Sequence, residues 1–120
     1  MGIKSYKNLI VWQKSMDLVA LIYGLTGKFP KEEIYGLTAQ MKRSAVSIPS
    51  NIAEGSKRSS RKDFRNFLII AYGSGAELET QIEIAARLNF CTIEDCDHIE
   101  RLLSEVMKML NALCDKFKQL

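Results

Sequence analysis

Histidine, cysteine and proline are scarce in this sequence of 120 residues, which contains one histidine, three cysteines and two prolines. The single histidine, His98, is not part of the Glu-x-x-His motif that di-iron bundles use, and no cysteines have the Cys-x-x-Cys spacing of common zinc sites. A G-x-S-x-G elbow and a glycine-rich phosphate loop are also absent. We therefore expect no catalytic residue, no metal site and no cofactor.

Long apolar runs are absent as well. No run approaches the roughly 20 residues of a membrane-spanning helix, and the polar segment 1–8 lacks the core of a signal peptide. Cys91, Cys96 and Cys114 are odd in number, and the chain is long enough to fold without covalent links, which favours reduced thiols. These features predict a cytoplasmic protein whose residues 1–120 form a single domain.

Apolar residues recur at helical spacing almost throughout, and no segment combines strict alternation with enrichment in β-branched residues. The pattern predicts four helices: about 8–26, a second that starts between 31 and 37 and ends near 55, about 60–88, and from about 92 through 117. Ser60 with Asp63, and Thr92 with Asp95, have the spacing of N-terminal caps. Short connections favour an all-α, antiparallel up-down-up-down four-helix bundle.

Each predicted helix has an apolar face that we expect to line the core. The expected inner faces, in chain order, are Leu9, Trp12, Met16, Val19 and Tyr23; Leu37, Met41, Ala45, Ile48 and Ile52; Phe64, Leu68, Ala71, Gly75, Leu78, Ile82 and Ala85; and Ile99, Leu103, Val106, Leu110, Leu113 and Phe117.

Pro49 lies inside the second predicted helix, where it removes one backbone hydrogen bond and clashes with the preceding turn. The helix must therefore kink or break there. Ile52 and Ala53 resume the apolar face directly afterwards, which favours a kink near Pro49, with Gly55 as a candidate C-terminal stop.

The first and third predicted helices carry more apolar surface than one inner face uses. The additional residues are Val11, Leu18, Ile22 and Leu25 on the first helix and Phe67, Ile70 and Tyr72 on the third. Such wide apolar arcs are typical of helices that are buried on two sides, so we expect a homo-oligomer. A wide core face in a monomer is the alternative.

Positive charge is concentrated in the first half of the chain. Residues 1–60 contain nine Lys or Arg against four Asp or Glu, whereas residues 61–120 contain eight against ten. Five cations surround the expected turn between the second and third helices, and two more lie upstream. The candidate nucleic-acid-binding residues are therefore Lys42, Arg43, Lys57, Arg58, Arg61, Lys62 and Arg65.

A basic cluster at a helix N-terminus suits the phosphates of RNA or DNA. Similar clusters also occur on solvated turns, and no helix-turn-helix, zinc-finger or RNA-recognition signature accompanies this one. The sequence thus favours a non-enzymatic nucleic-acid-binding oligomer, with a homo-oligomeric scaffold for protein–protein interaction as the alternative.

Several short segments resemble one bacterial family, the 23S rRNA intervening sequence proteins. They are Tyr6-Lys-Asn-Leu9, Val11-Trp-Gln13, Phe29-Pro30, Tyr35-Gly-Leu-Thr38 with Gln40, Ser47-Ile-Pro-Ser-Asn-Ile-Ala-Glu-Gly55 and Gly73-Ser-Gly-Ala-Glu-Leu-Glu-Thr80. The resemblance spans nearly the whole chain and implies an antiparallel four-helix bundle. The family is similar to the accessory protein of diversity-generating retroelements, a pentamer that binds nucleic acid through basic surfaces, and so implies a homopentamer.

The family name does not establish contact with the ribosome, since it records where the genes were first noticed. Within the shared segments, we expect polar contacts around the kink from Asn51, Glu54, Arg58, Glu77 and Glu79. Ordinary hydrogen bonds between helices are an equally good interpretation of these five residues.

Overall fold

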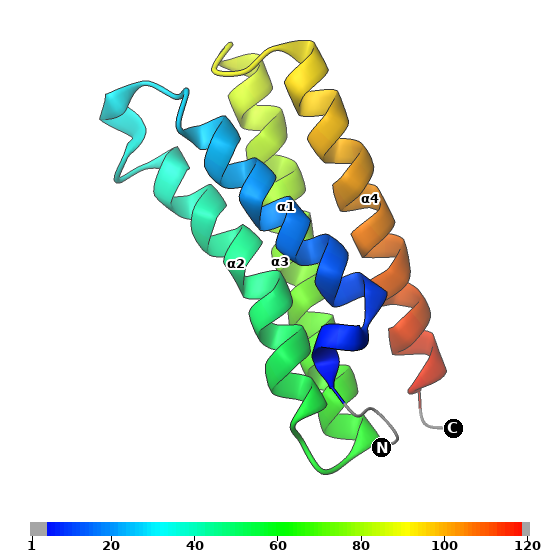
Figure 1. The fold of residues 1–120 in the computed structure, drawn as a ribbon. Coiled ribbons are helices and arrows are strands. Elements are labelled where there is room, and N and C mark those ends of the chain that lie inside the picture. The colour runs from blue at the N-terminus through cyan, green and yellow to red at the C-terminus, as the bar shows by residue number, and fades with distance from the viewer. Residues whose placement is uncertain (1–4, 119–120) are drawn as a thin grey trace.

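The computed structural model describes residues 5–118, and four long helices dominate it (Figure 1). They are α1 (Ile10–Thr26), α2 (Leu37–Ser56), α3 (Arg61–Arg87) and α4 (Ile93–Lys116), with short 3-10 turns η1 (Tyr6–Asn8) and η2 (Lys31–Glu33). The described residues contain no strand. The prediction of an all-α fold is confirmed.

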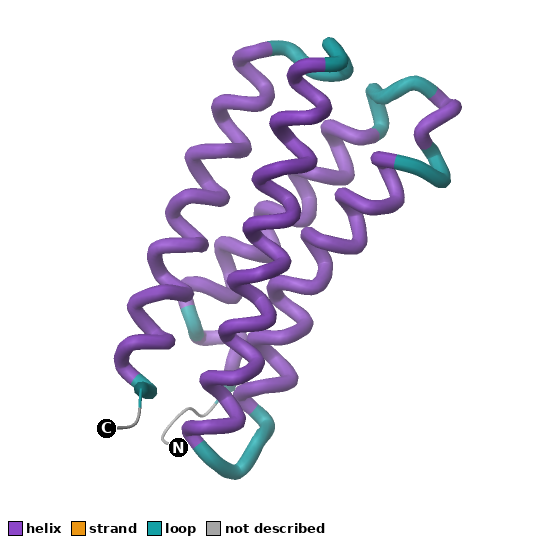
Figure 2. The backbone as a smooth tube through the Cα atoms, turned by 180° about the vertical axis from the view of Figure 1, so that it is seen from behind, coloured by secondary structure: helices purple, strands orange, loops and turns teal. Residues whose placement is uncertain are grey.

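The helices alternate in direction and form a closed bundle (Figures 1 and 2). Each helix packs against its neighbours in the chain, and α1 completes the bundle by packing against α4. The bundle measures 45 × 23 × 22 Å. One end, here called the turn end, contains the α2–α3 turn, η1 and the end of α4, while the connections α1–α2 and α3–α4 lie at the opposite, loop end. The up-down-up-down prediction is confirmed.

The predicted inner faces of α2, α3 and α4 form the core. Each of these residues is buried except Leu113, which is half-buried. The spacing of the apolar residues was sufficient to predict the inner faces of these three helices, because each helix carries one dominant apolar stripe.

The predicted inner face of α1 is wrong. The stripe of Val11, Leu18, Ile22 and Leu25 is buried in the core, whereas Met16 is 43% exposed. The residues of the stripe that was expected to face the core are half-buried or exposed. They are Leu9, Trp12, Met16, Val19 and Tyr23. Both stripes have helical spacing, so periodicity alone could not distinguish them.

A buried serine interrupts the apolar pattern of the stripe of α1 that faces the core. Ser15 is fully buried within it, and its hydroxyl donates to the Trp12 carbonyl at 2.8 Å. Because that hydrogen bond satisfies the hydroxyl, a polar residue can occupy a core position. In the sequence, it makes this stripe look less apolar than its neighbour.

The helix ends follow the predicted caps at α3 and α4. The Ser60 hydroxyl accepts from the Asp63 backbone N–H at 3.1 Å, and Thr92 accepts from Asp95 in the same way at 3.1 Å. Gly55 is not a stop signal, because α2 continues to Ser56. The glycine is buried instead, at a close contact between α2 and α3.

Helix α2 runs through Pro49 without a break, and the proline itself is buried. The alternative of a broken helix is therefore wrong, while a kink stays a prediction. Within the described residues, no helix combines the length and apolar character needed to cross a membrane.

Candidate nucleic-acid interface

The α2–α3 turn brings five of the seven predicted cations together. Lys57 follows the last residue of α2, and Arg61 and Lys62 occupy the first turn of α3. The turn is short because Ser60 caps α3 only four residues after α2 ends. Arg58 lies in the turn itself and Arg65 one helical turn into α3, so these cations share the turn end of the bundle.

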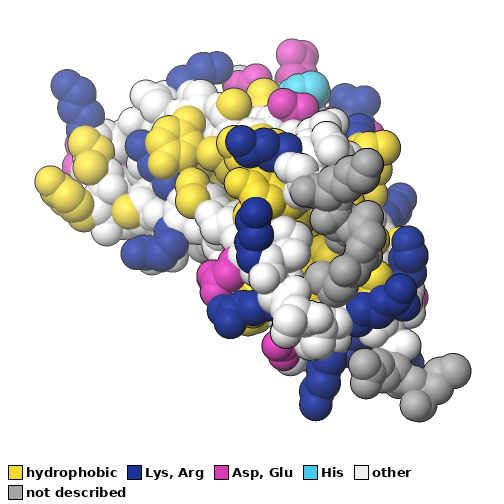
Figure 3. Space-filling view, turned by 60° about the horizontal axis from the view of Figure 1, so that its bottom comes forward, with side chains coloured by type: hydrophobic (Ala, Val, Ile, Leu, Met, Phe, Trp, Pro, Cys, Tyr) yellow, Lys and Arg dark blue, Asp and Glu magenta, His cyan; other side chains and the backbone are white. Residues whose placement is uncertain are grey.

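The antiparallel topology adds cations that the sequence interpretation missed. Helix α4 ends where α3 begins, so Lys116 and Lys118 join the turn end, as does Lys7 of η1. Among the described residues, the turn end then carries eight cations, Lys7, Lys57, Arg58, Arg61, Lys62, Arg65, Lys116 and Lys118, against three acids, Glu54, Asp63 and Asp115. We call these eight cations the basic end, and Figure 3 turns it toward the viewer.

The loop end has the opposite balance. Its acids are Glu32, Glu33, Glu83, Glu94, Asp95, Asp97 and Glu100, against Lys28, Lys31, Arg87 and Arg101. Three of these four cations are already paired, Lys28 with Asp95, Arg87 with Glu83 and Arg101 with Asp97. The excess of positive charge therefore lies at the turn end rather than at the loop end.

Aromatic rings position several side chains of the basic end. The Arg58 guanidinium lies 4.8 Å from the centre of the Phe67 ring and also forms an ion pair with Glu54 at 2.8 Å. Lys57 lies 5.8 Å from the Tyr6 ring. Cation–π contacts at exposed sites contribute about 0.5–1 kcal/mol, enough to bias a rotamer while the charge stays in solvent.

Arg65 has a structural contact that the other members of the basic end lack. Its Nε donates to the carbonyl oxygen of Cys114 at 2.9 Å, across from α3 to the last turn of α4, and its side chain is half-buried. A cation is favourable there because the final carbonyls of a helix carry partial negative charge. Arg65 therefore joins two helices, and its charge is less available to a ligand.

Lys42 and Arg43 lie apart from the other five predicted cations. They lie about 15 residues before the α2–α3 turn, which corresponds to roughly 22 Å along a helix. They also diverge from each other, since Lys42 lies 4.6 Å from the Tyr23 ring of α1 whereas Arg43 borders a groove between α2 and α3. The structure thus brings five of the seven predicted residues together and separates these two.

Two of the segments that carry the family resemblance, Ser47–Gly55 and Gly73–Thr80, meet between α2 and α3. The hydroxyls of Ser47 and Ser74 lie 2.8 Å apart, and Asn51 Nδ2 donates to the Ser47 carbonyl at 2.8 Å. Below them, a Cβ placed on Gly55 would lie 2.7 Å from Phe67 Cβ. The shared segments therefore encode a close helix–helix contact.

The five residues expected to make polar contacts around the kink do not form one cluster. Asn51 bonds within α2, and Glu54 pairs with Arg58. Glu77 borders the α2–α3 groove, whereas Glu79 lies on the opposite flank of α3, beside α4. Helical spacing explains the separation, because residues two positions apart point to different faces.

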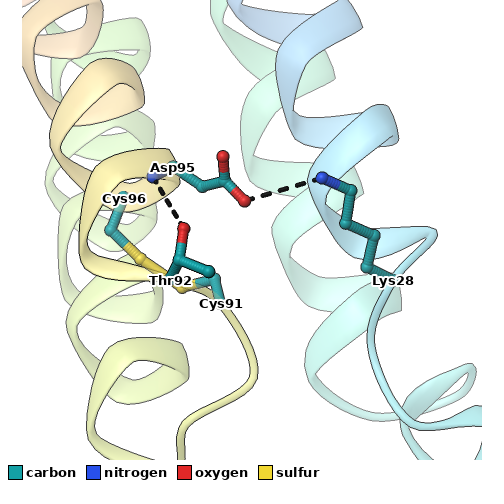
Figure 4. Close-up of a disulfide and its surroundings, with 5 residues drawn as sticks. All are labelled: Lys28, Cys91, Thr92, Asp95 and Cys96. Atoms are coloured by element: carbon teal, nitrogen blue, oxygen red, sulfur yellow. Dashed lines mark hydrogen bonds and ion pairs between the residues drawn. A yellow bond between two sulfur atoms is a disulfide. The ribbon is translucent and has the colours of Figure 1, made fainter.

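Two cysteines at the loop end are joined, which corrects the expectation of three reduced thiols. Cys91 and Cys96 form a disulfide with their Cα atoms 6.5 Å apart, next to the Thr92 cap and the Lys28–Asp95 ion pair (Figure 4). Their separation of five residues matches no common motif. The pairing becomes visible only in the structure, where the turn before α4 brings Cys91 next to Cys96. Cys114 is free, and burial raises the pKa of its thiol.

An apolar groove lies between α1 and α2, on the side where the predicted inner face of α1 is exposed. Its volume is about 330 Å³. The lining residues are Tyr6, Trp12, Met16, Val19, Val46, Pro49, Ser50 and Ala53. Among the described residues, no group of three or more His, Cys, Asp or Glu side chains is arranged to hold a metal ion.

Comparison with known proteins gives one family. The family model described as 23S rRNA-intervening sequence protein matches residues 7–112. The chain is also similar to a crystal structure from Bacteroides thetaiotaomicron, a protein of unknown function from the S23 ribosomal protein family. The two chains are 29% identical with a TM-score of 0.79, over 88% of this chain and 98% of that one. No curated protein matches. The chain belongs to the 23S rRNA-intervening sequence protein family.

Proposed function

We propose that this protein is a non-enzymatic, homo-oligomeric four-helix bundle that binds RNA or DNA through the phosphates at its basic end. The observation that carries the proposal is the excess, within residues 5–118, of eight cations over three acids at the turn end, whereas acids predominate at the opposite, loop end. Such polarity concentrates a polyanion on one surface of a protein whose net charge is only +3.

Phosphate contact fits this surface better than base readout. Its cations lie at helix ends and on a short turn rather than along the length of one helix. The first turn of α3 adds backbone N–H groups and the positive end of the helix dipole next to Arg61 and Lys62. Contacts of this kind supply affinity with little sequence preference.

Self-association would multiply the weak contacts of one basic end. Exposed apolar side chains, among them Met16, Tyr23 and Val46 around the apolar groove, provide a surface for a second copy. Because a ring presents the same patch several times, its avidity exceeds that of a single chain. We propose a homopentamer on the basis of the family resemblance. The Cys91–Cys96 disulfide removes the reduced-thiol argument for a cytoplasmic location.

The test is fluorescence anisotropy with structured ribosomal RNA and with duplex DNA across a salt series. The variant Lys57→Glu with Lys62→Glu reverses two exposed cations of the basic end. The matched control Lys28→Glu with Lys31→Glu makes the same change in net charge at the loop end. For duplex DNA, each lost phosphate contact lowers the salt slope by about 0.9, so we expect a reduction of roughly 2 for the first variant only.

Two outcomes contradict the proposal. One is wild-type binding that does not change between low and moderate salt, and the other is equal weakening by both double variants. Oligomer mass, measured in the same buffers by light scattering, shows whether a loss of binding follows from dissociation of the oligomer.

A protein-interaction scaffold is the second candidate, favoured by the apolar groove between α1 and α2. On that alternative, the charge-reversed variants retain partner capture, while a charge placed in the groove abolishes it. Absence of binding to RNA and DNA at low salt, with capture of a specific partner from the native host, supports the scaffold over the nucleic-acid proposal.

A further inference from the structure

The flank of α3 beside α4 carries apolar side chains that face solvent. Ile69 and Tyr72 are 45% and 40% exposed, and Ala76, one turn further along, is exposed as well. Glu79 follows at the same alternating spacing of three and four residues, so all four side chains lie on one face of the helix. We call these four residues the α3 ridge. Contiguous apolar surface of this kind, bordered by a charged group, is typical of protein–protein contacts.

The apolar groove between α1 and α2 has the complementary character. On α2 it is lined by Val46, Pro49 and Ala53, and Lys42 lies on the same face of that helix, one turn closer to the loop end. Neither Lys42 nor Glu79 forms an ion pair with another described residue. The groove therefore joins apolar side chains to an unpaired cation, whereas the α3 ridge joins apolar side chains to an unpaired carboxylate.

The two surfaces also match in height along the bundle. The hydroxyls of Ser47 and Ser74, 2.8 Å apart, set the level of α2 against the antiparallel α3. Tyr72 of the α3 ridge lies two residues before Ser74. Pro49 of the groove lies two residues after Ser47, so it stands at the level of Tyr72.

The charged groups obey the same register. Glu79 and Lys42 stand at one level, since each lies five residues from its serine toward the loop end. Equal height matters because a closed ring turns each copy about one axis without shifting it along that axis. With the bundles standing along the axis, a surface of one copy meets surfaces of its neighbour at the same level. The α3 ridge and the apolar groove meet this condition in both their apolar and their charged parts.

We infer that the α3 ridge of one copy docks into the apolar groove of a second copy, with Glu79 paired to Lys42. The ridge lies beside α4 and the groove lies between α1 and α2, so each copy keeps one of the two surfaces free for the next copy in a ring. Docking through the sides leaves the basic end open. The inference rests on the self-association in the proposed function and identifies the surfaces that form it, and it does not require nucleic acid.

The first test measures oligomer mass by sedimentation velocity without nucleic acid. Tyr72→Glu would bury a charge in the contact and should reduce the mass to that of one chain. Ile70→Glu is the matched control, because Ile70 is 51% exposed but lies two residues away, on the other flank of α3, and it should leave the mass unchanged. Circular dichroism checks that both variants keep their helices.

The second test exchanges the inferred ion pair. Lys42→Glu and Glu79→Lys each place like charges opposite one another and should raise the dissociation constant of the oligomer about tenfold or more. The double variant restores an opposite pair, so it should assemble nearly as well as wild type. Lys42→Glu with Glu77→Lys has the same net charge but places the new cation on the α2 side of α3, and it should not restore assembly.

The possible failures separate this inference from the proposed function. A wild-type chain that stays monomeric removes both the inference and the proposed self-association, whereas RNA and DNA binding is measured independently by anisotropy. The inference alone is overturned by a wild-type oligomer that Tyr72→Glu leaves intact, or that Ile70→Glu dissociates equally. It is also overturned if exchanging the charges of Lys42 and Glu79 fails to restore assembly.

Discussion

Glycines within α2 and α3 occupy very different surroundings. A Cβ on Gly55 would lie 2.7 Å from Phe67 Cβ and 2.9 Å from Phe64 Cδ1, whereas one on Gly73 would meet nothing within 4 Å. Gly75 is intermediate, because the nearest group is the flexible end of Met107. We therefore expect the same substitution to have different effects on stability at these glycines.

These surroundings predict opposite outcomes for the same substitution. Gly55→Ala should lower the free energy of unfolding by about 1–3 kcal/mol, because the methyl group overpacks the α2–α3 contact. Gly73→Ala should raise it by about 0.5–1 kcal/mol through helix propensity. Urea denaturation checks both. Destabilisation by Gly73→Ala, together with loss of oligomer mass, would instead place Gly73 at a contact between copies.

The cysteines differ in reactivity. Alkylation of the native protein without reductant should modify none of the three, since Cys91 and Cys96 are joined and burial raises the pKa of the Cys114 thiol and shields it. Unfolding without reductant should expose one reactive thiol, and unfolding with reductant should expose three. Mass spectrometry counts the added groups, and three groups without reductant would contradict the disulfide.

At the scale of the helices, two of the long-range polar contacts of α4 join it to α1 near the middle of the helix and to α3 near its end. Arg65 of α3 donates to the Cys114 carbonyl, and Lys14 of α1 donates to Glu105 at 2.6 Å. Both link residues far apart in the sequence. Arg65 and Lys14 are both half-buried, whereas Glu105 is exposed.

Arg65→Met should destabilise the protein by about 1–2 kcal/mol, because a hydrogen bond to a helix C-terminus is lost. The control is Lys62→Met, one turn earlier, which should stay within about 0.5 kcal/mol of wild type. Thermal unfolding distinguishes the two. Equal stability of both variants would show that the Arg65 contact contributes nothing measurable.

The Lys14–Glu105 pair predicts a pH dependence. A hydrogen bond from Lys14, reinforced by its charge, lowers the pKa of the Glu105 carboxyl. A lowered pKa in the folded state means that the pair stabilises the fold above the ordinary carboxyl pKa, and that this contribution disappears as the pH falls through the lowered value. Carboxyl-carbon NMR should therefore show Glu105 titrating below the ordinary pKa of a glutamate carboxyl, and Lys14→Met should raise its pKa toward that ordinary value.

At the scale of the whole molecule, charge and apolar surface are segregated. Cations gather at the turn end, acids at the loop end, and the apolar groove lies along the side between α1 and α2. This separation allows self-association through the side without covering the basic end.

If the proposed oligomer forms through the apolar groove, a charge placed there should dissociate it and leave the fold intact. Met16→Glu suits this purpose because Met16 is 43% exposed and outside the core. The control, Ile93→Glu, makes the same kind of change at the loop end and should leave the mass unchanged. Sedimentation velocity measures the mass and circular dichroism checks the helices. An unchanged mass for Met16→Glu would exclude this groove from the interface.

Much of the fold was determined by the sequence itself. Helix number, direction, caps, and the inner faces of α2, α3 and α4 follow from local spacing, because a single dominant apolar stripe can only face a core. Five of the seven candidate cations could also be placed together from the sequence, because they surround one short turn.

Tertiary packing decided what local spacing could not. Which of two apolar stripes on α1 faces inward depends on its neighbours α2 and α4, and the assignment of Gly55 to a contact depends on Phe64 and Phe67 of another helix. The cations near the C-terminal end join the basic end only because α4 runs antiparallel to α3. The orphaned oxygen of Gln81 likewise exists only in the folded chain, since an unfolded glutamine is hydrated by water.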